Sequence, residues 1–402
     1  MRPELLITFL LCFTMWLCDL FLWPDLRGML LFIFAVLLLV VYFLHKKDPP
    51  NFPPGPPALP VLGNVFSIES KQPHIYLTKL ADVYGNVFCI CLGRHKTVFV
   101  SGWKMVKEAL VTQADSFVDR PYSPMVTRIY SGNSAGLFFS NGRVWRRQRR
   151  FAMTTLRTFG LAKSSVEQSI CDESQHLQEA MEEEEGEPFD PVPLLNNAVA
   201  NIICQIVFGR RFDYNDHNFQ SMLKNLTEMA YLEGSIWALL YDAFPALMKH
   251  LPGPHNGIFS SARSLEASIR REIERHKLEL DPSNPRDYID NFLIEEKHNR
   301  NSEEGFDEGN LALCCLDLFL AGSETTSKTL QWGLIYLIQN PHIQGRRACL
   351  GEGLARTELF LFFVSLLQRF NFSTLDGVEL STEGITGATR TPFPFKIYAK
   401  SR

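Results

Sequence analysis

Apolar and polar positions follow two different periods along the body of the chain. Short β-rich runs at 87–92 and 97–100 flank the turn signal Gly93-Arg-His-Lys96, which predicts a hairpin. From about residue 103 onward the apolar positions recur with the period of a helix, and the tail at 391–399 looks extended again. The pattern therefore predicts a mainly α-helical fold with minor β structure near its ends.

Two apolar runs at the start of the chain predict an N-terminal membrane anchor at 1–47. The second run, Met29 to Leu44, contains no charge, and it would rise about 24 Å as a helix, somewhat less than the roughly 30 Å of a membrane core. A cleaved signal peptide is the alternative, but no small-residue cleavage site follows Leu44. Lys46 and Lys47 indicate that the chain beyond the anchor is cytosolic.

A proline-rich segment at 48–60 separates the anchor from the rest of the chain. Its core, Asp48-Pro-Pro-Asn-Phe-Pro-Pro-Gly-Pro-Pro57, forbids a helix and favours stiff polyproline geometry. An SH3-type ligand is one interpretation, but the position favours a rigid hinge in front of a large domain at 61–402. The net charge of −4 argues against a general nucleic-acid binder, and nine cysteines without a CxxC pair argue against a zinc ribbon.

The first of three local features is the arginine-rich segment Arg143-Val-Trp-Arg-Arg-Gln-Arg-Arg150. On a helix, Trp145 and Arg149 lie one turn apart on the same face. An indole N–H beside a guanidinium suits a carboxylate or a phosphate group. A solvated basic face and an isolated nucleic-acid patch are the alternatives.

The second feature is a long apolar helix predicted over 311–338, whose charges, including Asp317, argue against a membrane span. Its centre reads Ala321-Gly-Ser-Glu-Thr-Thr326. Gly322 would let a ligand approach the backbone closely, and threonine hydroxyls can bend a helix by bonding to preceding carbonyls. Glu324 beside Thr325 would form a proton relay. The alternative is an ordinary helix interior with a tolerated glycine.

The third feature is the loop Gly345-Arg-Arg-Ala-Cys-Leu-Gly351, directly before an amphipathic helix. The helix N-terminus and Arg347 would favour the thiolate form of Cys349 and make it a good metal ligand. A single thiolate cannot hold zinc, but it is sufficient as the axial ligand of a heme iron.

The order of these motifs resembles the cytochrome P450 family, specifically its microsomal family 2, and is most similar to the J subfamily. The resemblance implies a cytochrome P450 fold, a heme cofactor and insertion of one oxygen atom of O2 into a substrate. Cys349 resembles the proximal metal ligand of the heme. Trp145, Arg149 and Arg347 resemble the donors to the heme propionates, and Arg120 is a further candidate for that role.

The resemblance extends to the distal side of the heme and to partners. Glu324 and Thr325 resemble the catalytic acid–alcohol pair that supplies protons, and Gly322 would open the oxygen groove. The stretches 121–136, 317–325 and 384–389 resemble substrate-facing segments. The implied substrates are polyunsaturated fatty acids and xenobiotics. The implied partners are NADPH-cytochrome P450 reductase and cytochrome b5, at the cytosolic face of the endoplasmic reticulum membrane.

The sequence departs from the family pattern at one junction, 344/345. His342 stands where the family has a phenylalanine, and the Glu-x-x-Arg helix, the strands after it and the loop under the heme are missing. We expect roughly a hundred residues to be absent, judged against the usual family length. Glu272-Ile-Glu-Arg275 has the right spelling, but it precedes the motif at 321–326 and is interpreted as a surface helix pair.

The gap leaves two functional classes open. Exon skipping or an error in the gene model would produce such a shortened form. The chain is either a membrane-bound heme-thiolate monooxygenase or a catalytically inert, truncated membrane protein that keeps only partner or lipid binding. Either way, the loss of part of the sheet and of the proximal core predicts uncovered apolar faces.

Overall fold

The computed structural model describes residues 28–30, 32–37, 50–59, 62–69, 72–93, 95–130, 132, 136–158, 164–298, 305–340, 353–375 and 377–402. Most of the predicted anchor at 1–47 lies outside these residues. None of the helices in the described part of the chain is long and apolar enough to cross a membrane. Within the described residues the fold is mainly helical with short strands, as predicted.

An N-terminal lobe, defined as residues 50–117, contains a two-stranded antiparallel sheet in which Val87 lies opposite Val100. The predicted hairpin is confirmed, but its second strand begins at His95, two residues earlier than expected. Gly93 occupies the turn with a φ of 59°, a backbone conformation that glycine adopts at no steric cost. The elements of this lobe are η1 (Val65–Ser67), α3 (Pro73–Tyr84), β1 (Val87–Leu92), β2 (His95–Val100), α4 (Trp103–Lys107), η2 (Glu108–Thr112) and η3 (Ala114–Phe117).

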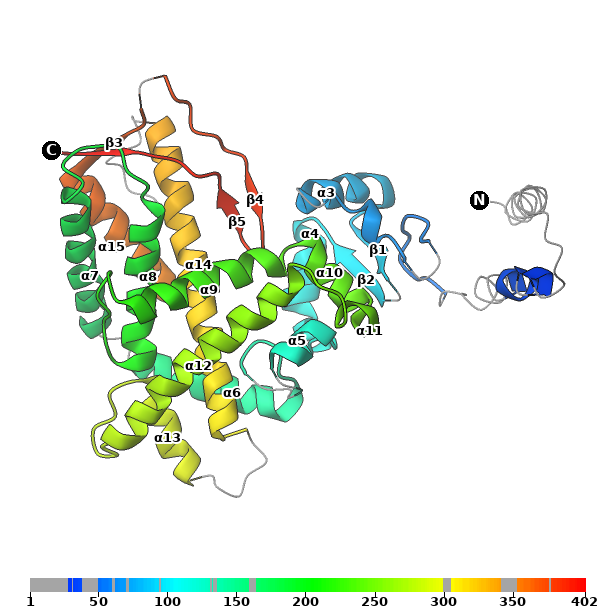
Figure 1. The fold of residues 1–402 in the computed structure, drawn as a ribbon, viewed down its shortest axis with the longest axis horizontal. Helices are drawn as coiled ribbons and strands as arrows, with labels where there is room; N and C mark the ends of the chain where they lie inside the picture. Colours follow the sequence, from blue (N-terminus) through cyan, green and yellow to red (C-terminus); the bar gives the residue numbers. More distant parts are fainter. Residues whose placement is uncertain are drawn as a thin grey trace.

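A helical body occupies the other side of the molecule in Figure 1 and is defined here as α5 to α14. Its elements are α5 (Pro124–Ile129), α6 (Gly142–Leu156), α7 (Ser164–Glu182), α8 (Val192–Phe208), α9 (His217–Glu233), α10 (Ile236–Ala243), α11 (Pro245–Met248), α12 (His255–Glu279), α13 (Tyr288–His298) and α14 (Glu308–Gln339).

The long helix α14 runs through the body and packs along α8 (Figure 1). The predicted helix at 311–338 is confirmed, with ends at Glu308 and Gln339. Asp307 caps its N-terminus, since the carboxylate accepts a hydrogen bond from the backbone N–H of Asn310 at 2.9 Å. All residues from Leu311 to Asp317 are buried, so this half of α14 lies in the core.

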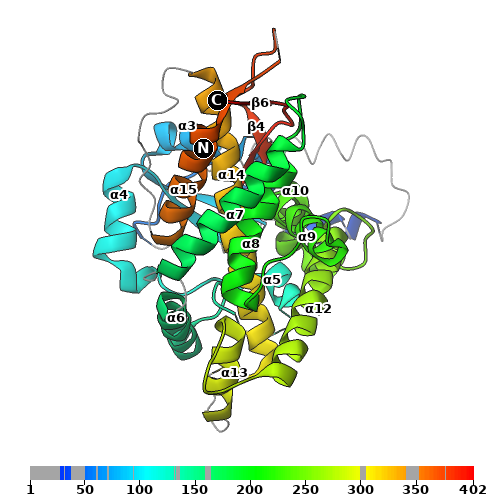
Figure 2. The same cartoon turned by 90° about the vertical axis from the view of Figure 1, so that its left-hand side faces the viewer.

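The C-terminal part begins with α15 (Gly353–Arg369), the helix predicted after the cysteine loop, and α15 packs against α7 and α14 (Figure 2). Four short strands follow and form two antiparallel pairs, β3 with β6 and β4 with β5. The turn after β4 reaches α9, where Ala388 donates a backbone hydrogen bond to the carbonyl of Ala230 at 2.8 Å. The strands are β3 (Phe370–Ser373), β4 (Gly384–Thr386), β5 (Arg390–Pro392) and β6 (Tyr398–Ser401).

Candidate functional site

Thr325 lies on an exposed stripe of α14 together with Thr329 and Tyr336. Its hydroxyl donates a hydrogen bond to the carbonyl of Ala321 at 2.7 Å, and the hydroxyl of Thr329 bonds to the carbonyl of Thr325 at 2.9 Å. Tyr336 is 52% exposed on the same face, three turns from Thr325. Since each hydroxyl gives its proton to the helix backbone, its lone pairs remain available on the open side of α14.

Glu324 points away from that stripe, into the interior. Its carboxylate lies 3.7 Å from the ammonium of Lys328 and accepts a hydrogen bond from the Thr389 hydroxyl at 3.2 Å. Burial raises the pKa of Glu324 above its ordinary value, although Lys328 and Thr389 oppose that shift. The acid and the alcohol are therefore adjacent in sequence but lie on neighbouring faces of the helix, about 100° apart.

Gly322 makes room for a side chain from α8. A Cβ atom at this glycine would lie 2.3 Å from Cδ1 of Ile203, closer than any real contact. The missing side chain thus lets α8 and α14 approach closely, which is a packing reason for glycine that the sequence interpretation did not include. The proposed part of Gly322 in an oxygen groove stays a prediction.

Trp145 and Arg149 lie together on α6, as their spacing predicts. The Cζ atom of Arg149 is 5.7 Å from the centre of the Trp145 ring, within the range of a cation–π contact. Trp145 is half-buried and Arg149 is exposed. The indole and the guanidinium are thus close enough to bind one small acidic group together.

Arg120 is hydrogen-bonded to Asn141, the residue that directly precedes α6. The backbone N–H of Arg120 donates to Oδ1 of Asn141 at 2.6 Å, and the side-chain Nδ2 of Asn141 donates back to the carbonyl of Arg120 at 3.0 Å. The Nε of Arg120 also donates to the carbonyl of Phe138 at 3.3 Å. The structure therefore brings Arg120 beside the start of the helix that carries Trp145.

Asp317 ties the loop before α6 to α14, a role that the sequence did not indicate. Its carboxylate accepts hydrogen bonds from the backbone N–H groups of Leu137 at 2.6 Å and Phe138 at 3.1 Å, and from the hydroxyl of Tyr130. Burial raises the pKa of Asp317 to about 6, against the opposing effect of these donors. This buried carboxylate thus ties the loop directly before the basic helix α6 to the motif helix α14.

Arg347 and Cys349 lie outside the described residues, so the structure does not place the predicted metal ligand or the third propionate donor. The helix predicted to follow them is present as α15. Of the site residues proposed from sequence, the structure places Arg120, Trp145 and Arg149 around the start of α6. It places Gly322, Glu324 and Thr325 near the middle of α14.

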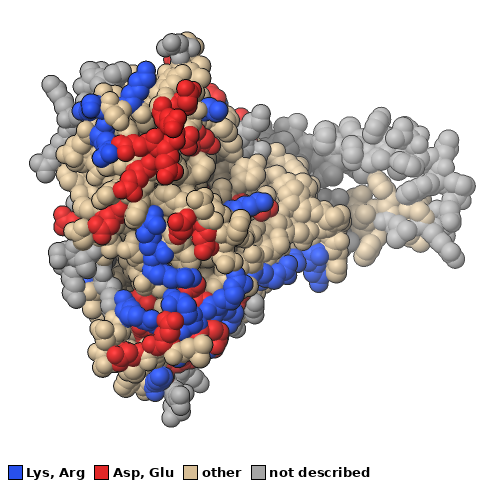
Figure 3. All heavy atoms as spheres, turned by 60° about the vertical axis from the view of Figure 1, so that its left-hand side comes forward, with Lys and Arg blue, Asp and Glu red and all other residues tan. Residues whose placement is uncertain are grey.

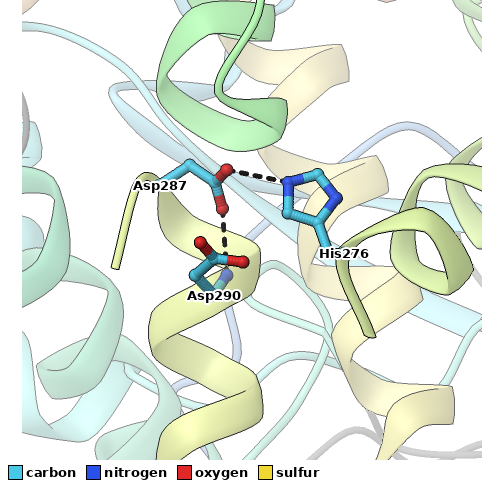
Figure 4. A group of neighbouring side chains, drawn as sticks. All are labelled: His276, Asp287 and Asp290. Carbon is cyan, nitrogen blue, oxygen red and sulfur yellow. Dashed lines mark hydrogen bonds and ion pairs between the residues drawn. The ribbon is translucent and has the colours of Figure 1, made fainter. Parts of the chain in front are cut away.

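A buried histidine–carboxylate group lies apart from this region, between α12 and α13 (Figure 4). Nε2 of His276 is 2.8 Å from Oδ2 of Asp287, and Nδ1 is 2.6 Å from the carbonyl oxygen of Glu272. Burial lowers the pKa of His276, but the hydrogen bond and charge of Asp287 outweigh it and raise the pKa overall. Because both ring nitrogens face acceptors, the imidazolium form is favoured and no lone pair is left for a metal.

Comparison with known proteins identifies the family. The cytochrome P450 family profile matches residues 53–344 and 344–398. Cytochrome P450 2J2 from Homo sapiens is 36% identical, covering 90% of this chain and 94% of the relative. Cytochrome P450 2J1 from Oryctolagus cuniculus is 35% identical over 91% of this chain and 94% of the relative. Cytochrome P450 2J5 from Mus musculus is 45% identical over 76% of this chain and 61% of the relative.

The alignments also locate a discontinuity. The alignment with the human relative spans 472 positions, whereas 90% of this chain is about 360 residues, so about 110 positions of the relative have no counterpart here. The two segments matched by the family profile meet at residue 344. Both segments match the same profile, and the chain belongs to the cytochrome P450 family, within its family 2.

Proposed function

We propose that this chain is an internally shortened family 2 cytochrome P450 with the site of a heme-thiolate monooxygenase. The observation that carries the proposal is the joint at Asp317, which ties Leu137 and Phe138, in the loop before the helix of Trp145 and Arg149, to the motif helix α14. Cytochrome P450 proteins bind heme, and the described residues fit such a group. On α6, Trp145 and Arg149 offer paired donors for the acidic groups of a heme. On α14, Thr325 lies on an exposed stripe that a heme could face.

In this proposal each residue has a defined task. Cys349 would be the thiolate ligand of the iron, and the propionates would be held by Trp145, Arg149, Arg347 and Arg120. The heme, when bound, supplies the activation of dioxygen. Thr325 offers a hydroxyl on the open stripe of α14. Glu324, held by Lys328 and Thr389, is the proton reservoir behind it.

The proposed substrates are lipophilic molecules, namely polyunsaturated fatty acids and xenobiotics, and the proposed electron donor is NADPH-cytochrome P450 reductase, with cytochrome b5 as a second donor. The proposed location is the endoplasmic reticulum membrane, with residues 1–47 as anchor, 48–60 as hinge and 61–402 as a cytosolic domain. The similarity to family 2 proteins supports these assignments.

A gap at 344/345 is part of the proposal. The break in the profile match at residue 344 and the roughly 110 unmatched positions of the human relative support it. Uncovered apolar side chains support it as well: Trp103 is 78% exposed and Val111 is 67% exposed. These exposures favour a second candidate function, a catalytically inert protein that keeps only partner or lipid binding.

The reduced carbon-monoxide difference spectrum of the purified full-length chain decides between the two candidates. We expect a Soret band of the thiolate type that is lost in Cys349→Ser. The matched control is Cys171→Ser, because Cys171 is exposed on α7 and the substitution should leave the spectrum unchanged. A wild-type chain without this band would overturn the monooxygenase proposal and leave the inert protein.

A further inference from the structure

A hollow in the surface of the helical body is lined by three arginines. It has a volume of about 290 Å³ and lies between α7, α8, the turn after α8 and the start of α13. Arg210, Arg211 and Arg286 line it, together with the polar side chains of Ser169 and Gln205. Among the described residues that line it there is no carboxylate. Lysine and arginine side chains gather in the lower half of the face shown in Figure 3, with acidic side chains among them.

Each guanidinium forms an ion pair with an acidic side chain that does not line the hollow. Arg210 pairs with Glu272, and Nε of Arg211 lies 2.7 Å from Oε2 of Glu173, which is fully buried. For Arg286, Nε lies 2.8 Å from Oδ2 of the buried Asp290, and Nη1 lies 2.8 Å from Oε2 of Glu279. These contacts fix the positions of the guanidinium groups before any ligand arrives, and they favour binding because less side-chain freedom is lost.

Aromatic rings fix two of the guanidinium planes. Arg210 lies over the ring of Phe212 at 4.3 Å, and Arg211 lies over the ring of Tyr214 at 5.1 Å. The side chains of the three arginines are 29 to 44% exposed. Arg210 and Arg211 are therefore ordered by a ring and an acid while part of each side chain stays open to solvent.

The acids behind the hollow are shared with other donors. Glu173 also accepts hydrogen bonds from the hydroxyl of Tyr214 at 2.7 Å and from Nδ2 of Asn201 at 3.3 Å. Glu272 also pairs with Arg275, at 3.0 Å. Arg210 and Arg211 each donate to their acid through one guanidinium nitrogen, so their other N–H groups can bind an anion on the side open to solvent.

We propose that this hollow binds a compact dianion of the phosphate-monoester class. The terminal oxygens of such a group accept paired N–H bonds from planar guanidinium groups, which Arg210 and Arg211 can offer, while Arg286 adds positive charge to the lining. Ser169 and Gln205 add neutral donors at the edge. The hollow suits a single such group, since pockets for larger organic ligands reach about 300 to 1,000 Å³. A soluble phosphate ester and a lipid headgroup both carry this chemistry.

Titration of the full-length chain in detergent with glycerol 3-phosphate, at constant ionic strength, tests the proposal by calorimetry. We expect saturable binding, with glycerol as the uncharged control. Gln205→Glu places a carboxylate in the hollow without removing any ion pair, and Arg210→Gln removes one lining cation. Each should weaken binding at least about tenfold, as the loss of a charge-assisted hydrogen bond does.

The matched control is Arg275→Gln, which also removes a partner of Glu272 but does not line the hollow, so its affinity should stay within about twofold of wild type. Absence of saturable binding by the wild type, or equal affinity in Gln205→Glu, would overturn the proposal. Flotation with phosphatidylcholine vesicles, with and without phosphatidic acid, assigns the source. Capture that requires phosphatidic acid and is lost in Gln205→Glu indicates a lipid headgroup; capture unaffected by either change indicates a soluble ester.

Discussion

The helical body and the N-terminal lobe differ in how completely their apolar side chains are covered. In the body, one continuous core extends from Ile129 to Phe319 and includes Tyr288 and Phe292, both with no exposed surface. In the lobe, the buried core consists of Ala81, Phe88 and Ile90. The described part of the chain thus contains one region with an extensive continuous core and one with a small buried cluster.

Exposed apolar residues in the lobe show where those partners are needed. Trp103, Val83 and Leu110 are 78, 72 and 66% exposed, although large apolar side chains of globular domains are usually covered when they cluster. The region after α14, where the alignment leaves about 110 positions of the human relative unmatched, is the proposed source of the missing cover. If this proposal holds, the effect of a gap near residue 344 extends to residues far away in the sequence, at 83–117.

The largest expected effect comes from restoring the unmatched segment. A chimera that inserts the corresponding residues of the human relative between Gln344 and Gly345 should slow amide hydrogen exchange in α3, β2 and α4 at least about tenfold, because buried amides open only by unfolding. Exchange in α8 and α14 should change little. Measurement by mass spectrometry that found unchanged exchange in the lobe would contradict the proposed origin of its exposure.

A pair of truncations measures the two regions directly. Phe292→Ala removes a fully buried ring that packs against Phe151 and Phe306, and it should lower the free energy of unfolding by about 3–5 kcal/mol. Trp103→Ala should change it by no more than about 0.5 kcal/mol, because that ring is exposed. Denaturant titration gives both values, and a large cost at Trp103 would show that the lobe is covered in solution.

A buried acid on α15 should make the C-terminal part pH-sensitive. Burial raises the pKa of Glu358 to about 8, against a hydrogen bond with Thr326, and its Oε1 atom has no hydrogen-bond partner among the described residues. Between its ordinary pKa of 4.5 and about 8 the unfolded chain releases this proton while the folded chain keeps it, so stability falls as the pH rises through that window.

Replacing that acid with Glu358→Gln should therefore stabilise the protein by about 3 kcal/mol near pH 7 and by little below pH 4.5. Thermal unfolding of both proteins from about pH 4 to pH 9 measures the difference. If the gain did not grow as the pH rises from about 5 to 8, the carboxyl would not be held neutral.

The smallest expected effect concerns helix starts. Helices α9 and α14 of the body begin with capping aspartates, Asp216 and Asp307, whereas α3 in the lobe begins at Gln72 without a side-chain cap. Asp307→Ala should cost about 1 kcal/mol. Gln72→Ala should cost no more than a few tenths. Equal losses in equilibrium unfolding would mean that the capping difference between α14 and α3 has no energetic weight.

Local patterns in the sequence predicted much of the fold. The apolar period placed α14 to within three residues at its start and one at its end, and the glycine-containing turn placed the β1–β2 hairpin. The predicted turn was two residues too long, because β2 already begins at His95 and includes Lys96, and both of these residues are polar and exposed. Such edge positions carry no apolar alternation to reveal the strand.

The site was only partly predictable, for a physical reason. Trp145 and Arg149 are one helical turn apart, so their contact follows from spacing alone. Asp317 bonds to the backbone of Leu137 and Phe138, about 180 residues earlier, and no local pattern specifies that pairing. The same is true of Gly322 and Ile203, because the identity of a packing partner depends on the tertiary arrangement of α8 and α14.

The β1–β2 hairpin has a consequence for the lifetime of the protein in the cell. Among the described strands only β1 pairs with β2, so β2 has one outer edge, and its side chains Val98 and Val100 are exposed on the face of the sheet. An unpaired edge of this kind accepts a strand from another molecule. Molecular chaperones and proteases bind such edges, so the abundance of this chain would be set by quality control as much as by its synthesis.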